Sequence, residues 1–200
     1  MVWLKRDLRL RAHHAIEAAF HADQDFILLY IMDSELIQHH DTSVRHLQFI
    51  YHSIQSMNQE LKSLQSRVEI FYGKSLEVMQ HLWQHFSIRS VYSYQETGIL
   101  NSWNRDKQVK RHLDAQGIPW VEFQKDGVIR GAGRRGDWRK KWYQKMKSAM
   151  PDYSVKHLGP RLMRPLDANS LGTFRLPAAL KNQLRSYSSH YQPAGESYAW

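Results

Sequence analysis

The chain has 200 residues, of which 42% are hydrophobic and 24% are charged, so it can bury a full core and has the balance of a soluble protein. It contains no cysteine, which excludes disulfides, thiolate metal sites and cysteine nucleophiles and fits a reducing, cytoplasmic setting. The longest apolar run, Phe26–Met32, is far shorter than the about 20 residues that cross a membrane, so we expect no membrane partner.

Short apolar runs with the composition of β-strands alternate with segments of helical periodicity. The predicted strands are Val2–Leu4, Phe26–Met32, Val68–Tyr72, Val91–Tyr94 and Trp120–Phe123. The predicted helices cover residues 13–22, 43–65, 75–86 and 102–116, and the second begins after the N-cap candidates Asp41, Thr42 and Ser43. This alternation predicts an α/β domain over residues 1–124, with a five-stranded parallel Rossmann-like sheet and helices on both faces.

The alternation ends after residue 124. A glycine-rich loop leads to a predicted helix over 137–148, which puts Trp138, Trp142 and Met146 on one face. We expect this face to pack against the α/β domain or against a partner domain. Prolines interrupt the rest of the chain, so residues 125–149 are predicted to be a basic loop and helix, and residues 150–200 an extended connector.

The positive charge is concentrated in one part of the chain. The formal net charge is +9, and the stretch from Lys125 to Lys147 holds nine Lys or Arg residues against Asp126 and Asp137. This stretch predicts contact with a polyanion or an acidic partner surface. A solvated basic helix that aids solubility is the alternative.

Ligands of parallel α/β sheets bind beyond the carboxyl ends of the strands, which here places chemistry in the loops 5–12, 33–42 and 95–104. The first of these loops holds four cations, and we expect Asp7 to pair with a neighbouring arginine while the other guanidinium groups are free for phosphate or carboxylate. A salt-bridged turn is the alternative. The chain has no glycine-rich phosphate loop, which excludes an ordinary dinucleotide or P-loop site.

The twelve histidines raise the question of a metal site. His81 and His85 have the i, i+4 spacing of a chelating pair, but we expect them on the solvated side of their helix without a carboxylate partner. The adjacent pairs His13–His14 and His39–His40 are expected to point in different directions. We therefore predict no metal site, and we find no nucleophile triad or other catalytic residue.

Several motifs occur in the order typical of one family. The opening run Val2–Arg11 resembles the first signature of photolyases and cryptochromes. Four further features follow in the family's order: Met32–Asp33, the long helix with its strand and Gly73, Glu96 with Arg105–Asp106, and Pro193–Glu196 with Ala199–Trp200. The resemblance covers nearly the whole chain and implies the strand order 3-2-1-4-5.

The resemblance implies a light-dependent flavoprotein with two domains, of which this chain is the first. The second, helical domain would hold FAD and bind DNA containing pyrimidine dimers, and the chain is expected to end as that domain begins. The first domain would dock against it and carry an antenna chromophore: a folate, a deazaflavin or FMN. The implied function is that of a deoxyribodipyrimidine photo-lyase, with this part alone inactive and free of FAD.

The resemblance also selects candidate antenna contacts. Glu96 occupies the family's antenna loop, where a carboxylate can accept hydrogen bonds from a pterin or flavin ring. A helix-capping or surface role is the alternative for Glu96. Trp3, Lys5 and Asp33 are further candidates because they lie at the strand edge, although Trp3 is also expected to belong to the core.

Two departures from the family pattern have structural consequences. Ala12 stands where the family has an acidic residue, so the helix over 13–22 is expected to lack the family's aspartate cap. The spacing from Glu96 to Arg105 is longer than is common in the family.

Two other functions stay open: a cryptochrome photoreceptor without repair activity, and a stand-alone nucleotide- or nucleic-acid-binding module. The module predicts a well-packed chain after residue 150.

Overall fold

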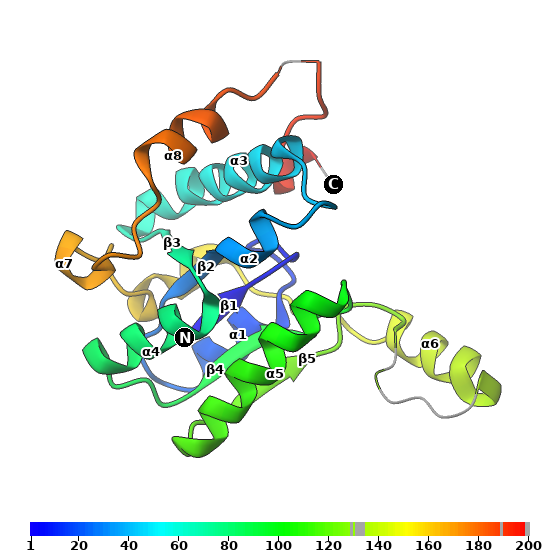
Figure 1. Cartoon of the computed structure of the whole chain (residues 1–200). Coiled ribbons are helices and arrows are strands. Elements are labelled where there is room, and N and C mark those ends of the chain that lie inside the picture. The colour runs from blue at the N-terminus through cyan, green and yellow to red at the C-terminus, as the bar shows by residue number, and fades with distance from the viewer. Residues whose placement is uncertain (129, 131–134, 189, 199–200) are drawn as a thin grey trace.

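A computed structural model describes residues 1–128, 130, 135–188 and 190–198 (Figure 1). Its centre is a five-stranded sheet in the order β3-β2-β1-β4-β5, in which every neighbouring pair is parallel. The strands are β1 Val2–Leu4, β2 Leu28–Asp33, β3 Val68–Gly73, β4 Val91–Tyr94 and β5 Trp120–Phe123. The predicted sheet and its strand order are confirmed.

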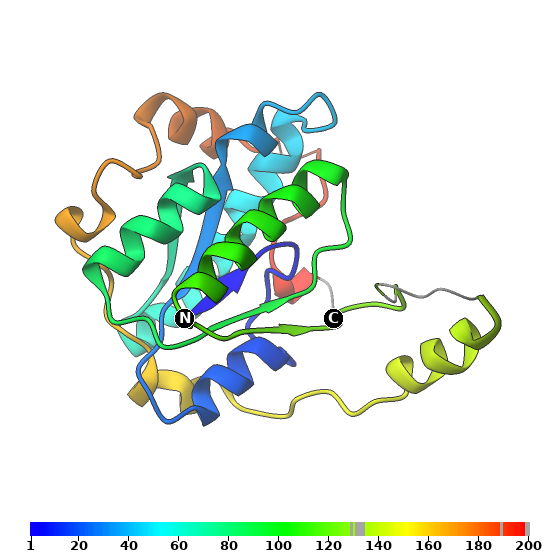
Figure 2. The same ribbon diagram turned by 60° about the horizontal axis from the view of Figure 1, so that its bottom comes forward.

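Helices cover both faces of the sheet, as the alternation predicted (Figure 2). They are α1 His14–His21, α2 Ser34–Ile37, α3 Val44–Leu61, α4 Ser75–His85 and α5 Leu100–Ala115, with a 3-10 turn η1 at Lys62–Leu64. Successive strand residues point to opposite faces. Accordingly Leu4 packs in the core with α1 and α3, while Trp3 packs in the core with α4 and α5.

The helix starts show which capping predictions hold. Ser43 caps α3 by accepting a hydrogen bond from the His46 amide, as predicted. The first helix lacks an aspartate cap, as predicted, but another residue takes that place. His13 caps α1, because its Nδ1 accepts a hydrogen bond from the Ile16 amide at 3.2 Å. Asparagine, aspartate, serine and threonine are the usual cap residues, so a histidine there was not expected.

The basic helix α6, Trp138–Met146, follows a 3-10 turn η2 at Arg135–Asp137 and lies apart from the rest of the molecule (Figures 1 and 2). None of its residues is buried. Its apolar face therefore does not pack against the α/β domain, and the other expectation, packing against a partner domain, stays a prediction. Instead the Trp138 indole donates a hydrogen bond to the Gly127 carbonyl at 3.1 Å, and the Trp142 ring lies against Gly127.

The segment after residue 150 wraps around the α/β layer as an extended chain with short helical elements. These are η3 Val155–Arg161, α7 Ala168–Leu171, α8 Ala178–Arg185 and η4 Glu196–Tyr198. The amide of Phe26 donates to the Arg161 carbonyl, and Gln48 on α3 donates to the Gln183 carbonyl at the end of α8. The buried side chains of this segment complete the core clusters of the α/β layer. No described helix is both long enough and apolar enough to span a bilayer.

Candidate ligand-binding site

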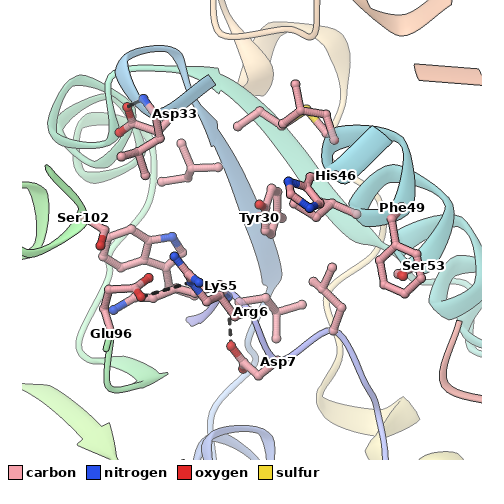
Figure 3. Close-up of a pocket in the computed structure, with 18 of the residues that line it drawn as sticks. Lys5, Arg6, Asp7, Tyr30, Asp33, His46, Phe49, Ser53, Glu96 and Ser102 are labelled. Carbon is pink, nitrogen blue, oxygen red and sulfur yellow. Dashed lines mark hydrogen bonds and ion pairs between the residues drawn. The ribbon is translucent and has the colours of Figure 1, made fainter. Parts of the chain in front are cut away.

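A cavity of about 860 Å³ lies beyond the carboxyl ends of β1, β2 and β4 (Figure 3). Its walls are the loop after β1, the helices α2 and α3, the start of α5, and Met150 with Gly195 and Glu196 from the C-terminal segment. Most of the lining is apolar, including Leu36, Ile37, Leu47, Phe49, Ile50 and Ile99. All four predicted site residues line this cavity: Trp3, Lys5, Asp33 and Glu96.

Lys5 is a buried cation that binds protein groups. Its Nζ lies 2.7 Å from Asp106 on α5 and 3.9 Å from Glu122 on β5. The ammonium also lies 4.6 Å from the ring centre of Trp3. Burial lowers the pKa of Lys5, and the neighbouring Asp106 carboxylate opposes this shift. Lys5 therefore ties the first strand to α5 at the base of the cavity.

Trp3 belongs to the core, as its apolar surroundings predicted. Only 1% of its surface is exposed, and its ring centre lies 5.5 Å from that of Trp120. The Arg105 guanidinium lies 4.9 Å from the Trp3 ring. Trp3 can form part of the cavity floor, but it offers little open ring surface for stacking.

Glu96 is buried between two arginines. Its Oε1 accepts a hydrogen bond from the Gly98 amide at 2.8 Å and lies 3.2 Å from Arg6 Nε, and its Oε2 lies 3.5 Å from Arg105. Glu96 is 4% exposed, so it is not a surface residue. The residue at the N-cap of α5 is Ile99, so Glu96 does not cap that helix either. The side chain of Arg6 is 58% exposed. A ligand donor could therefore reach this carboxylate by displacing Arg6.

Asp33 is at the rim of the cavity with its acceptor positions occupied. One oxygen accepts hydrogen bonds from the Glu35 and Leu36 amides and caps α2. The other accepts from the amide and hydroxyl of Ser75 at the start of α4. A carboxylate has about four acceptor positions, so little capacity is left for a ligand. Asp33 shapes the rim by joining β2, α2 and α4.

Two polar side chains that the sequence did not single out also face the cavity. Tyr30 projects from β2 and His46 from the first turn of α3 (Figure 3). Burial raises the pKa of Tyr30 to about 12, which keeps its hydroxyl protonated and able to donate. Among the residues described here, none forms a hydrogen bond with that hydroxyl. Tyr30 was missed because it stands inside an apolar strand, where a tyrosine normally indicates packing.

The prediction that Asp7 pairs with a neighbouring arginine is wrong. Its Oδ2 lies 2.6 Å from His13 Nε2, and its Oδ1 accepts from the Lys5 amide at 3.0 Å. His13 Nδ1 accepts from the helix α1, so Nε2 carries the proton that is donated to Asp7. Burial acts to raise the pKa of Asp7, but the hydrogen bonds from His13 and from the Lys5 amide outweigh it and hold the pKa below its usual value.

The guanidinium groups of the opening loop are also engaged by the protein, so the expectation that they are free is wrong. Arg6 pairs with Glu96. Arg9 donates to the Ala12 carbonyl and to the hydroxyl of Tyr94, and Arg11 pairs with Glu60. The opening loop is thus the salt-bridged turn given above as the alternative, and these arginines hold the loop in place beneath the cavity.

The sequence profile of the family described as DNA photolyase matches residues 1–152. The chain belongs to the DNA photolyase family. A deoxyribodipyrimidine photo-lyase of Synechococcus sp. is 24% identical over 139 residues, which are 66% of this chain and 28% of the relative. The chain thus spans under a third of that photolyase's length.

Solved structures of photolyases and cryptochromes share the fold. An archaeal photolyase from Sulfolobus tokodaii superposes with a TM-score of 0.66 over 97% of this chain and 43% of its own. The cryptochrome of Synechocystis sp. PCC6803 superposes with a TM-score of 0.62 over 78% of this chain and 35% of its own. A class III photolyase of Agrobacterium tumefaciens superposes with a TM-score of 0.55 over 74% of this chain and 31% of its own. Each is 17% identical to this chain, so these likenesses establish the α/β fold of the family.

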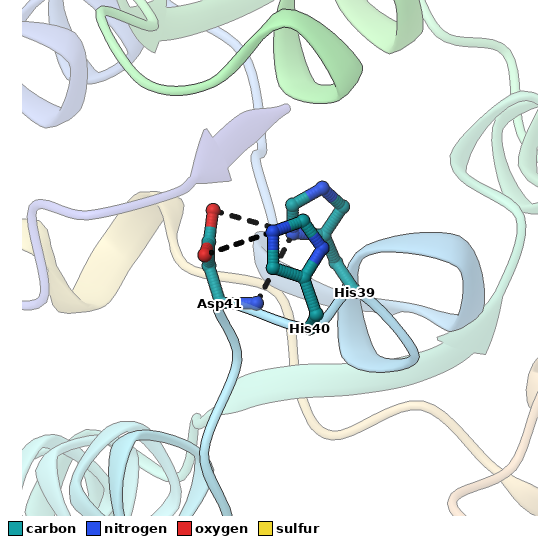
Figure 4. Close-up of side chains that lie close together, drawn as sticks. All are labelled: His39, His40 and Asp41. Atoms are coloured by element: carbon teal, nitrogen blue, oxygen red, sulfur yellow. Dashed lines mark hydrogen bonds and ion pairs between the residues drawn. The ribbon is translucent and has the colours of Figure 1, made fainter.

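The histidine pairs of this photolyase-family chain are arranged differently from the prediction. The rings of His39 and His40 approach to 4.3 Å between centres, and both contact the Asp41 carboxylate, at 3.5 and 3.2 Å (Figure 4). They therefore point toward one another. The Asp41 amide also donates to His39 Nδ1, so contacts within the loop account for the cluster, and we assign no metal to it.

The pair on α4 is arranged similarly. His81 and His85 lie 4.1 Å apart between ring centres. His81 is not on a solvated side, because the C-terminal segment covers it: its Nε2 contacts the Ser170 carbonyl at 2.8 Å, and its ring lies 5.2 Å from that of Phe174.

Proposed function

We propose that this chain is the antenna-binding α/β domain of a longer, light-dependent DNA photolyase. The observation that carries the proposal is the cavity of about 860 Å³ at the carboxyl edge of the sheet. Largely apolar walls with a few convergent polar groups suit a planar heterocyclic ligand. A folate, a deazaflavin and FMN all have this character. The structure of the archaeal relative is described as holding two FAD molecules and as implying a novel light-harvesting cofactor, which supports a flavin.

The lining residues suggest how such a ring would be held. The protonated hydroxyl of Tyr30 would donate to a carbonyl or ring nitrogen, and Glu96 would accept from a ring N–H after Arg6 moves aside. Phe49, which is 38% exposed, would cover one ring face. Trp3 and Lys5 would form the floor beneath the ligand.

The rest of the proposal concerns the whole protein. FAD would bind in a helical domain outside this chain, and that domain would bind DNA containing pyrimidine dimers and repair them under blue light in the cytoplasm. The α/β domain over 1–124 would dock against it. Residues 125–149 would form a basic loop and helix, and residues 150–200 would be the connector that leads toward the helical domain. The cofactor chemistry of repair then belongs to FAD, and this chain supplies none of its catalytic residues.

A titration tests the antenna proposal. The purified chain is titrated with FMN, FAD, a reduced folate and a deazaflavin, and fluorescence reports binding. We expect saturable binding of at least one chromophore, about tenfold weaker in Phe49→Ala because burial of an aromatic face is lost. Val44→Ala is the matched control, since Val44 is an exposed apolar residue of the same helix outside the cavity. Equal affinities in the two variants, or no binding of any of the four, would contradict the proposal.

Two other functions have an observation in their favour. One is a cryptochrome photoreceptor, since a cryptochrome shares the fold. Repair and signalling are separated by incubating the complete protein with irradiated DNA under blue light and measuring the loss of pyrimidine dimers. A stand-alone module predicts a well-packed C-terminal segment, and Leu158, Leu162 and Leu184 are indeed buried. Hydrogen exchange along that segment separates the module from the connector.

A further inference from the structure

The helix α6 is a concentration of unpaired positive charge. The helix and its C-cap residue together carry five basic side chains and no acidic one: Arg139, Lys140, Lys141, Lys145 and, at the C-cap, Lys147. Among the residues whose contacts the structure describes, none forms an ion pair with any of these five side chains. Some basic residues elsewhere are paired, as Lys110 is with Asp114 on α5. Others, such as Lys107 and Arg111, have no ion pair within the described part of the chain, but they lie among acidic neighbours rather than in a run without any. Like charges three or four residues apart destabilise a helix, so α6 favours a partner that neutralises them.

The geometry of α6 directs one basic face outward. Its aromatic side folds back on the preceding loop, where Trp138 donates to the Gly127 carbonyl and Trp142 lies against Gly127. At 100° per residue, Lys140, Tyr143 and Lys147 lie on the opposite side of the helix. Tyr143 is 44% exposed, and the Lys147 ammonium lies 5.8 Å from its ring centre. This outward face therefore presents two cations around an exposed aromatic ring.

The composition of this face selects the kind of partner. A helix that lies in a membrane interface presents a continuous apolar face. The apolar face of α6 is short and only partly free, because the Trp138 indole and the Trp142 ring are held at Gly127, while Trp138 and Met146 stay exposed. Uncompensated lysines with an exposed tyrosine are typical of surfaces that bind nucleic acid. The nine residues of α6 span about 13 Å, which is close to the width of the DNA major groove, about 12 Å. The phosphates of the two strands run along the rims of that groove.

We propose that α6 is an arm that binds the phosphate backbone of duplex DNA. It lies outside the cavity, so this site and the antenna site are separate, and either can fail without the other. The binding is electrostatic and independent of base sequence, because no part of the proposed face reads base edges.

The test uses the purified chain and a labelled duplex of about 25 base pairs, with anisotropy measured from 50 to 200 mM salt. We expect weak binding whose association constant falls with salt concentration, with a slope of about −2 on logarithmic axes for the two phosphate contacts of the outward face. The double variant Lys140→Glu/Lys147→Glu should bind at least about tenfold more weakly and reduce the slope by about 2.

The matched control is Lys107→Glu/Arg111→Glu, which makes the same charge change on exposed positions of α5. We expect it to retain affinity within about threefold of the original chain. Equal losses of duplex affinity in the two variants would overturn the proposal, since the change in net charge alone would explain them. An affinity of the α6 variant equal to that of the original chain would also overturn it. Tighter binding to single strands, to vesicles of anionic lipid or to an acidic peptide than to the duplex would also overturn it. Circular dichroism checks that each variant is folded.

Discussion

The substitution Asp7→Asn tests the buried contact between Asp7 and His13. Asp7 is 2% exposed, and its carboxylate accepts a charge-assisted bond from His13 at 2.6 Å and another from the Lys5 amide. Hydrogen bonds to charged groups contribute about 1.5–3 kcal/mol, and an amide cannot accept from both donors without burying an unpaired N–H. We therefore expect a loss of about 2–3 kcal/mol, or a Tm lowered by roughly 4–12 °C for a domain of this size.

The pH dependence of this loss follows from the pKa of Asp7. That pKa is held below its usual value, so the unfolded state takes up its proton first as the pH falls. The stability difference between the original chain and the variant should be constant from pH 5 to 7. It should shrink as the pH falls below about 4, where the unfolded carboxyl becomes protonated.

Urea unfolding followed by circular dichroism, repeated across this pH range, measures both effects. Asp25→Asn is the control, because Asp25 is exposed and a surface change of this kind usually costs less than about 0.5 kcal/mol. The reasoning would be refuted if Asp7→Asn lost less than about 0.5 kcal/mol of unfolding free energy. It would also be refuted if the stability difference between the original chain and this variant stayed constant down to pH 2.5.

Two further predictions concern the backbone. Gly73→Ala should destabilise the chain more than Gly117→Ala. Both glycines have positive φ, of 148° and 65°, but only a side chain at Gly73 would collide with the ring of Phe174. Equal melting temperatures of the two variants in thermal unfolding would contradict this. In hydrogen exchange, the amides of residues 186–198 should be less protected than those of β1 to β4. Uniform protection to residue 198 would favour the stand-alone module.

The sequence predicted the parts of the fold that depend on local patterns. Apolar runs located the five strands, and the stripe from Leu47 to Leu61 with the Ser43 cap located α3, because strand and helix periodicity are properties of neighbouring residues. The strand order came from the family resemblance. The predicted site residues did meet around one cavity, since loops at the carboxyl ends of parallel strands share one edge of the sheet.

The failures concern partners that are distant in the chain or that follow no pattern. Asp7 was assigned to a neighbouring arginine because sequence shows the near cations, whereas His13 reaches it only through the turn between β1 and α1. Tyr30 and His46 become cavity residues only when β2 and α3 are packed together. The aromatic stripe of α6 predicted packing against a domain, but only Trp138 and Trp142 contact the preceding loop at Gly127, and no residue of the helix is buried.

The central claim is that the cavity holds an antenna chromophore separate from FAD. The most direct test is the absorption spectrum and extracted chromophore content of the complete protein, with and without Glu96→Ala. The account predicts FAD together with a second chromophore, and a loss of the second alone in the variant, because Glu96 lies in the cavity wall of this chain. A complete protein that contains FAD alone, or a variant that loses both chromophores equally, would contradict it.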